Sequence, residues 1–169
     1  MNETIQANKF FGNKSTVSEI IIIAENITTP ENIGSLIRLT DNIGAKKLFL
    51  INDIIPNQAK IKRSSSSAYN NVDFKFIDYD DLKTDFFKDY TFVGIDTINS
   101  SKNIYEYSFN KNTAFIVGNE KSGISPKMIS FCNEFIHIPM PGNTKSMNVS
   151  HALAVSLFEY YRQQLYRFK

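Results

Sequence analysis

The sequence has little of the chemistry that disulfides and metal sites need. Cys132 is its single cysteine, so no internal disulfide can form, which agrees with a reducing compartment. Its two histidines, His137 and His151, show no spacing typical of metal ligands, so no metal site is expected. No apolar run approaches the roughly 18 residues that span a bilayer, and residues 1–17 lack the apolar core of a signal peptide. These absences favour a cytoplasmic protein with no membrane partner.

Two common signatures are also missing. No G-x-G-x-x-G follows a predicted strand, and no G-x-S-x-G occurs, which removes the commonest serine hydrolase pattern. Gly118 and Gly123 have the separation found in a phosphate-binding loop, but Ile124 stands where that loop requires lysine. Binding of a nucleoside triphosphate is therefore disfavoured.

The composition is that of one globular domain. The 169 residues are 42% hydrophobic and 21% charged, enough apolar content for a substantial core. We expect a polar N-terminal extension at residues 1–17 and a single domain at residues 18–169. The net charge of +2 is compatible with a nucleic-acid partner if basic residues cluster. Lys60, Lys62 and Arg63 do cluster, although a solvated helix face is the ordinary alternative.

Strand and helix patterns alternate along the chain. Residues 19–24 contain four consecutive isoleucines, which predicts a central strand buried on both faces of a mainly parallel sheet. Thr29 and Pro30 predict the start of the next helix, and Gly44 predicts its end. The remaining predictions are strands at 47–52, 73–77, 91–96 and 113–118, a strand ending at Pro139, helical patterns at 58–69, 79–88, 126–132 and 148–166, and a polar connection at 97–112. This order predicts an α/β fold.

Two stretches with unusual glycine placement suggest a ligand site. Gly34 lies inside the first predicted helix, where glycine costs about 1 kcal/mol relative to alanine, so a backbone or a ligand must approach closely. Asn32 and Arg38 lie about 120° apart around that helix, which favours two neighbouring contacts over a direct pair. Residues 116–124 form a glycine-flanked acidic loop after a strand, which suits a small polar ligand. An exposed arginine and a plain turn are the respective alternatives.

The stretch at residues 135–154 combines a strand, a loop with proline and glycine, and the start of a helix. Small molecules bind at this kind of junction in open α/β sheets, because backbone amides and helix starts converge there. Ser146 and Asn148 stand at the helix start, and capping of that helix is the alternative role for both. The last helix carries a broad apolar stripe, including Leu153 and Leu157, which predicts a subunit interface.

Taken in order, the three stretches resemble the motifs of the SPOUT superfamily, specifically the TrmH (SpoU) family of RNA ribose 2′-O-methyltransferases. The similarity covers residues 19–162 and is carried by Asn32-x-Gly34-x-x-x-Arg38, Val117-Gly118-Asn119-Glu120-x-x-Gly123-Ile124 and Ile138-Pro139-Met140-x-Gly142-x-x-x-Ser146-Met147-Asn148-Val149-Ser150. It implies a SPOUT-type α/β fold with a mainly parallel sheet and a deep C-terminal trefoil knot, which no pattern argument predicts. It also implies a homodimer that binds S-adenosylmethionine (AdoMet) in the knot and methylates RNA.

The resemblance implies roles for individual residues. Arg38 matches the catalytic arginine, and Asn32, Glu120, Ser146 and Asn148 match the polar residues around it. The residues implied to bind AdoMet are Thr97, Ile116, Gly118, Asn119, Gly123, Ile138, Met140, Ser146 and Met147. Because a guanidinium is a donor only, we expect Arg38 to bind a phosphate and stabilise the developing alkoxide, oriented by Glu120 through a charge-assisted bond.

The resemblance leaves the RNA substrate open. Without separate RNA-binding domains, the chain is expected to hold RNA through its catalytic domain, Lys60, Lys62, Arg63 and a second subunit, which favours tRNA. Methylation of ribosomal RNA and a catalytically silent RNA-binding dimer are the alternatives, although a scaffold has no need of all five polar motif residues. A nucleotide-binding Rossmann protein comes third, because its glycine fingerprint is missing. One departure from the family is Ser67, which stands where glycine is usual.

Overall fold

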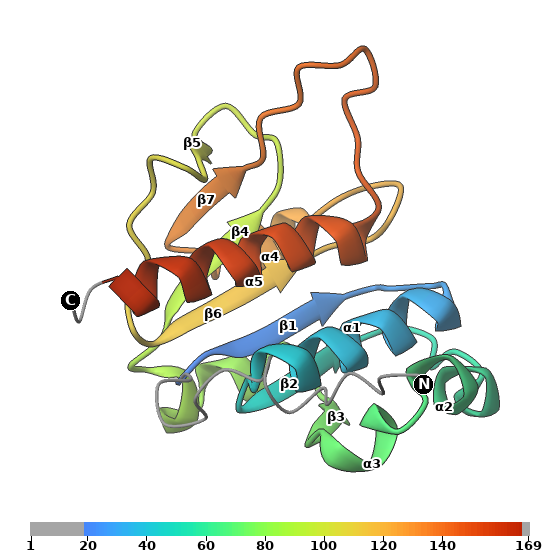
Figure 1. Cartoon of the computed structure of the whole chain (residues 1–169). Helices are drawn as coiled ribbons and strands as arrows, with labels where there is room; N and C mark the ends of the chain where they lie inside the picture. The colour runs from blue at the N-terminus through green and yellow to red at the C-terminus, as the bar shows by residue number, and fades with distance from the viewer. Residues whose placement is uncertain (1–18, 167–169) are drawn as a thin grey trace, which may run out of the picture.

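Seven parallel strands form one sheet in the order β3-β2-β1-β6-β4-β7-β5 (Figure 1). The computed structural model describes residues 19–166, so the predicted extension at residues 1–17 lies outside the described part. The strands are β1 (Ile21–Glu25), β2 (Lys47–Ile51), β3 (Phe74–Phe76), β4 (Thr91–Ile95), β5 (Lys102–Asn103), β6 (Thr113–Val117) and β7 (Glu134–His137). Because neighbouring strands pair in parallel, their carboxyl ends meet at one edge of the sheet.

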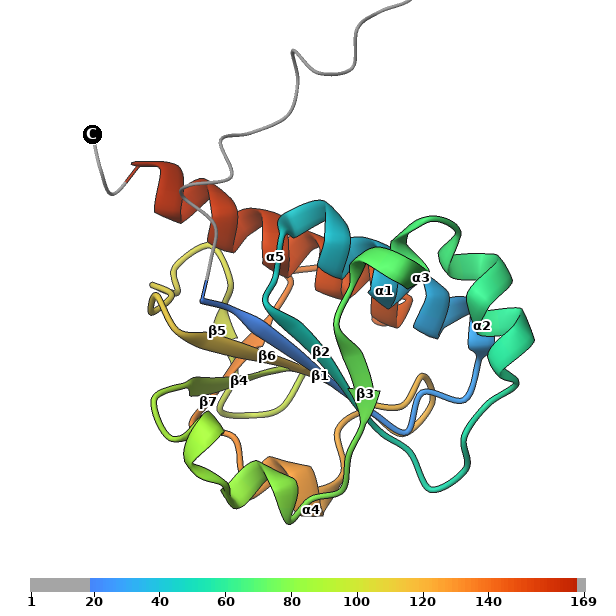
Figure 2. The ribbon, with the colours of Figure 1, turned by 90° about the horizontal axis from the view of Figure 1, so that it is seen from below.

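Helices cover both faces of this sheet. They are α1 (Pro30–Ile43), α2 (Gln58–Ser65), α3 (Ala68–Asn71), α4 (Pro126–Ile129) and α5 (Val149–Tyr166), with the short 3-10 helices η3 (Asp81–Lys83) and η4 (Asp85–Phe87). On one face lie α1, α2, α3 and α5, whereas α4 and the 3-10 helices lie on the other (Figure 2). Within residues 19–166 no helix combines the length and the apolar character that crossing a membrane requires.

The central strand β1 packs into both cores at once. Ile22 and Ala24 belong to the core under α1 and α5, whereas Ile21 and Ile23 belong to the core on the α4 face. All four side chains are fully buried. Successive side chains of a strand point to opposite faces, so an unbroken apolar run is what a doubly covered strand needs. The α/β fold and the central position of this strand are confirmed.

Several predicted boundaries are confirmed, and one strand was missed. Helix α1 begins at Pro30, and Gly44 ends it in the left-handed conformation with φ 66°. Thr29 takes the N-cap position, but its side chain makes no capping hydrogen bond. Strand β5 lies inside the predicted polar connection, because two polar residues give no strand pattern. The trefoil knot stays a prediction.

The helix predicted at residues 79–88 is wrong. The segment forms η3 and η4, separated by Thr84, whose backbone is extended with φ −74° and ψ 159°. The Asp78 carboxylate accepts hydrogen bonds from the backbone N–H of Asp80 (2.8 Å) and of Asp81 (3.2 Å). The Thr84 hydroxyl donates to the carbonyl oxygen of Asp81 at 2.8 Å. Such local side-chain bonds to the backbone compete with a continuous α-helix.

Gly34 is required by the packing of α1 against α2. A Cβ atom at residue 34 would lie 2.0 Å from the hydroxyl oxygen of Ser64 and 2.8 Å from its carbonyl carbon. The Ser64 hydroxyl donates across the contact to the carbonyl oxygen of Pro30 at 3.2 Å. The close approach predicted from the sequence is therefore that of a neighbouring backbone.

The chain after α2 turns at Ser66 and not at Ser67. Ser66 has a positive φ of 55° with ψ −137°, a region that favours glycine. Ser67, which stands at the position of the family glycine, has an ordinary helical φ of −62°. The departure at residue 67 therefore causes no backbone strain at that residue.

Replacing Gly34 by alanine is expected to lower the free energy of unfolding. Alanine favours a helix by about 1 kcal/mol over glycine, but overpacking costs about 1–3 kcal/mol. A rotamer change cannot relieve the contact with the carbonyl carbon of Ser64, so we expect a net loss in equilibrium urea unfolding. Gly142→Ala is the control, because no atom lies within 4 Å of its Cβ position. Equal stability of the two variants would contradict this account.

Candidate active site

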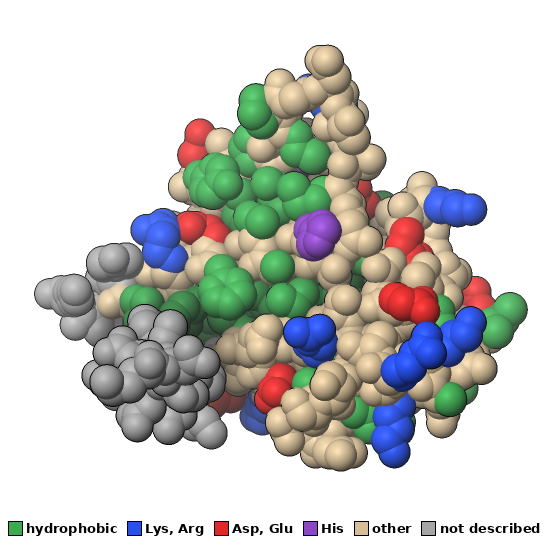
Figure 3. Space-filling view, turned by 45° about the vertical axis from the view of Figure 1, so that its right-hand side comes forward, with side chains coloured by type: hydrophobic (Ala, Val, Ile, Leu, Met, Phe, Trp, Pro, Cys, Tyr) green, Lys and Arg blue, Asp and Glu red, His purple; other side chains and the backbone are tan. Residues whose placement is uncertain are grey.

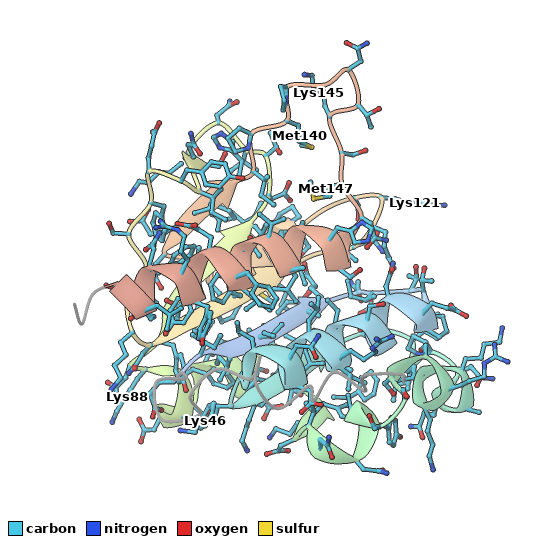
Figure 4. The ribbon with its side chains drawn as sticks, in the orientation of Figure 1. Lys46, Lys88, Lys121, Met140, Lys145 and Met147 are labelled. Carbon is cyan, nitrogen blue, oxygen red and sulfur yellow. The ribbon has the colours of Figure 1, made fainter. Side chains whose placement is uncertain are left out.

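A pocket of about 250 Å³ opens at the carboxyl edge of the sheet. Its walls come from the ends of β4, β6 and β7, the loops that follow them and the start of α5. Figure 4 shows Met140, Lys145 and Met147 on the long loop between β7 and α5, and Lys121 on the loop after β6. Open parallel sheets bind their ligands at this edge. The pocket is therefore the candidate site.

A second, wider hollow of about 640 Å³ lies at the opposite edge. It surrounds Thr91 and Glu134, where β4 and β7 begin, and most of its lining is polar or charged. No motif stretch contributes to it. Its position at the amino ends of the strands makes it the weaker candidate.

All but one of the residues predicted to bind the cofactor line the pocket. They are Thr97, Gly118, Asn119, Gly123, Ile138, Met140, Ser146 and Met147. Ile116 does not line it, because its side chain is fully buried in the core on the α4 face. Asp96 and Lys145 also line the pocket and were missed. Asp96 directly follows β4, and a polar residue at the carboxyl end of a strand is the signal that would have found it.

The loop after β6 is closed on itself. Asn119 and Gly123 exchange two backbone hydrogen bonds of 2.9 Å each. The Asn119 side-chain oxygen accepts from the backbone N–H of Lys121 (2.9 Å) and of Ser122 (3.1 Å). A Cβ atom at Gly118 would lie 2.2 Å from the carbonyl oxygen of Gly123, so only glycine fits there. The loop's shape is therefore fixed by its own backbone.

Glu120 caps helix α1 from this loop. Its carboxylate accepts hydrogen bonds from the backbone N–H of Thr28 (3.3 Å) and Thr29 (3.2 Å) and from the Asn32 amide (2.8 Å). Partial burial alone would raise the pKa of Glu120, but the bonds from Asn32 and from the backbone outweigh it and lower the pKa from 4.5 to about 2. The side chain is ionised at neutral pH and satisfies orphan N–H groups at the helix start.

Asn148 joins the third motif to the first two. Its side-chain N–H donates to the Asn32 side-chain oxygen at 3.1 Å. Its own side-chain oxygen accepts from the backbone N–H of Ser150 (2.9 Å) and from the Ser150 hydroxyl (2.7 Å) at the start of α5. The capping role considered from the sequence is therefore present for Asn148. Asn32, Glu120 and Asn148 form one hydrogen-bonded chain beside the pocket.

Arg38 is not part of this chain. Its side chain is exposed on α1 and lines neither hollow. Among residues 19–166 it has no hydrogen bond or ion pair, and the expected bond from Arg38 to Glu120 is absent. The carboxylate of Glu120 is already occupied by Asn32 and by the start of α1. The 120° separation of Asn32 and Arg38, about a third of a turn, agrees with this outcome.

Two surface features were predicted from the sequence, the basic cluster of α2 and the apolar stripe of α5, and only the first is exposed. Lys60, Lys62 and Arg63 are exposed on α2. The stripe residues Leu153 and Leu157, in contrast, are fully buried against the chain's own sheet, so they cannot form an interface. The exposed apolar side chains of α5 are Phe158 (50%) and Leu165 (42%). Hydrophobic side chains are visible on the face that α1 and α5 share (Figure 3).

The described chain matches a known family over most of its length. The model of the SpoU rRNA Methylase family matches residues 19–158. The chain belongs to this family. The α/β architecture and the resemblance to SpoU methyltransferases are thereby confirmed.

Individual members of the SpoU family show how far the similarity extends. A tRNA (guanosine(18)-2′-O)-methyltransferase of Aquifex aeolicus is 30% identical, over 86% of this chain and 70% of that protein. The 23S rRNA (guanosine-2′-O-)-methyltransferase RlmB of Acinetobacter baylyi is 29% identical, over 86% of this chain and 60% of that protein. The crystal structure of the SpoU methyltransferase AviRb from Streptomyces viridochromogenes in complex with AdoMet has a TM-score of 0.76 and 25% identity, over 86% of this chain and 58% of that chain. This chain spans less than two thirds of the last two.

Replacing Glu120 by glutamine is expected to change how stability depends on pH. The pKa of Glu120 is about 2 in the folded protein and 4.5 ordinarily, so its ionised form contributes stability above pH 4.5 that is lost as the pH falls towards 2. The difference in unfolding free energy between wild type and Glu120→Gln should therefore be largest at neutral pH and shrink below pH 4.5. Urea unfolding at several pH values measures it. A difference that does not vary with pH would contradict the capping role.

Proposed function

We propose that the protein transfers a methyl group from AdoMet to the 2′-hydroxyl of a ribose in RNA, with tRNA as the favoured substrate. The observation that carries the proposal is the chain Asn32–Glu120–Asn148, which joins three distant motifs beside one pocket. Membership of the SpoU family supports the reaction class. A relative whose structure is described in complex with AdoMet supports the methyl donor.

The pocket residues fit AdoMet by their chemistry. Ile138, Met140 and Met147 offer an apolar wall that suits an adenine ring. Asp96 is a carboxylate at the pocket wall that suits the donor's cationic groups and ribose hydroxyls. When bound there, AdoMet supplies a methyl group made electrophilic by its sulfonium. These residues are proposed to hold it.

The chain's own part is to position the ribose and to manage the charge on its oxygen. Ser146 lines the pocket with an exposed side chain and is proposed to contact the substrate ribose. Arg38 is proposed to bind the phosphate beside that ribose and to stabilise the alkoxide that forms as the hydroxyl loses its proton. Asn32, Glu120 and Asn148 keep the motif loops in place and do not orient Arg38.

We also propose a homodimer in which Arg38 of one copy serves the pocket of the other. Arg38 is exposed and does not line the pocket of its own chain, an arrangement that suits a guanidinium supplied to the pocket of a second copy. Helices α1 and α5 lie side by side (Figure 1), and Phe158 and Leu165 are exposed on α5. Seven residues apart, these two side chains lie on the same side of the helix. A second copy packed here would cover them and bring α1 to the interface.

The RNA is proposed to be held by the exposed cations of α2. Lys60, Lys62 and Arg63 can neutralise phosphates without reading sequence. Both tRNA and 23S rRNA enzymes occur among the relatives, and the chain spans more of the tRNA enzyme, 70% against 60%. Ribosomal RNA methylation is the second candidate. Mapping of 2′-O-methyl positions in total RNA with and without the protein decides between the two substrates. If the protein adds no methyl group to either RNA, the remaining candidate is a catalytically silent RNA-binding dimer.

Arg38→Lys is expected to lower single-turnover methylation of tRNA by about 100-fold, the size of effect found when one charge-stabilising donor is removed. Lysine keeps the positive charge but loses the planar fork that binds a phosphate with two bonds. Labelled AdoMet and purified tRNA give the rate. The role of Arg38 fails if this variant keeps a rate near that of the wild type.

Mixing two inactive variants tests the shared site. Arg38→Ala removes the guanidinium, and Thr97→Trp fills the pocket from an exposed lining residue. Heterodimers would contain one site with both parts intact, so the mixture should recover activity that neither variant shows alone. Adding Phe158→Asp to both chains should abolish this recovery and give monomers in analytical ultracentrifugation. Activity of a monomeric Phe158→Asp protein would contradict the proposal.

A further inference from the structure

Two successive amides at the exit of the pocket loop donate to carboxylates from two different strands. The backbone N–H of Ile124 donates to Asp96 at 3.0 Å, and the backbone N–H of Ser125 donates to Glu25 at 2.8 Å. Glu25 is the last residue of β1, and Asp96 directly follows β4. Since β1 and β4 are the two neighbours of β6, the loop that leaves β6 is held from both sides.

Glu25 is a buried carboxylate that accepts hydrogen bonds from Ser125, at the exit of the loop, and from Tyr79. Its side chain is 1% exposed. Besides the amide of Ser125, it accepts a bond from the Ser125 hydroxyl at 2.5 Å and one from the Tyr79 hydroxyl. Burial, followed by the bond to Glu25, raises the pKa of Tyr79 to about 12, so the phenol keeps its proton and donates. A buried carboxylate is costly unless it is bonded in this way.

The bond from Ser125 reaches beyond the loop. The Ser125 hydroxyl also accepts from the backbone N–H of Met128 at 3.1 Å and so caps α4. Met128 is fully buried in the core on the α4 face. Glu25 therefore ties the end of the pocket loop to a rigid part of the fold.

Asp96 approaches the loop through a space that glycine leaves open. Gly123 has φ +70°, and a Cβ atom there would lie 2.5 Å from the carboxylate of Asp96. The other carboxylate oxygen of Asp96 accepts from the backbone N–H of Thr97 at 2.7 Å. Asp96 lines the pocket, whereas Glu25 does not. The two carboxylates thus differ in whether they could touch a ligand.

We propose that Glu25 and Asp96 are positioning residues that hold the loop from Gly118 to Ser125 in its binding conformation before the methyl donor arrives. The inference rests on the proposed function, because it assigns this pocket to AdoMet. The loop supplies Gly118, Asn119 and Gly123 to the pocket wall, so a change in its exit moves that wall. Apparent affinity falls in proportion to the share of molecules whose loop is correctly placed.

Glu25→Gln is the deciding variant, because it alters the loop without touching the pocket. Glutamine has nearly the shape of glutamate, but it replaces one accepting oxygen by an N–H₂ donor. This donor would face the Ser125 N–H and the hydroxyls of Ser125 and Tyr79, which all donate to Glu25. If the loop is correctly placed in about one tenth of molecules, the dissociation constant for S-adenosylhomocysteine rises about 10-fold. Isothermal titration calorimetry measures this value. Hydrogen exchange of the ligand-free protein should be faster at residues 118–125 and unchanged in α5 from Leu153 onward, the part of that helix that does not line the pocket.

Glu134→Gln is the matched control. This carboxylate lies at the start of β7, away from the pocket, and pairs with Lys102 at 2.7 Å. The dissociation constant and the hydrogen exchange of residues 118–125 should therefore both stay at wild-type values. Asp96→Asn is measured in the same way, and it becomes the test of the inference if Glu25→Gln does not fold. Its exchange at residues 118–125 is the reading to use, because the side chain could also touch the ligand directly.

The outcomes separate the inference from the function on which it rests. A lower melting temperature of Glu25→Gln with unchanged affinity and unchanged loop exchange would make Glu25 a core residue only and overturn the inference. Wild-type protein that binds no S-adenosylhomocysteine would overturn the proposed function and the ligand part of the inference. Loop exchange in the ligand-free variants would still decide whether the carboxylates hold the loop.

Discussion

The hydrogen bonds of the Glu120 carboxylate are the interaction on which the site depends. A helix start leaves several N–H groups without partners, and α1 takes its acceptor from a loop about ninety residues further along the chain. Thr28, Thr29 and Asn32 all donate to this one side chain. The first two motifs can therefore reach their final shape only together, and Asn148 adds the third through its bond to Asn32.

Several acidic side chains around the pocket bind the protein's own backbone. Glu25, Asp96 and Glu120 each accept backbone N–H groups at the carboxyl edge of the sheet, where strands end and loops or helices begin. Charged acceptors form the stronger class of hydrogen bonds, so they suit an edge with many unpaired amides. Gly34 and Gly118 follow the same logic, because both make room for the chain's own atoms. The shape of the pocket is therefore set by contacts within the protein itself.

Short-range signals predicted the fold well, and long-range contacts escaped them. The isoleucine run of β1 and the start of α1 at Pro30 are local, and both are confirmed. Ile116 was assigned to the cofactor only by the family resemblance, and because its strand is buried on both faces its side chain lies in the core and not at the pocket. The segment at residues 79–88 has apolar residues at helical spacing, but local side-chain bonds to the backbone break it into two turns. The partners of Glu120 lie too far away in sequence for any pattern to find them.

The charges around the pocket suit a site that must hold a cationic donor and a polyanion close together. Asp96 and Glu120 line it as carboxylates, whereas Lys121 and Lys145 come from its two loops. Lys145 donates to the carbonyl oxygens of Met140 (3.2 Å) and Gly142 (2.6 Å), so its charge stays on the outer loop. In the proposed reaction the carboxylates favour a sulfonium and repel a phosphate, while the lysines do the reverse. This separation would keep the RNA backbone at the rim and admit only the ribose oxygen to the methyl group.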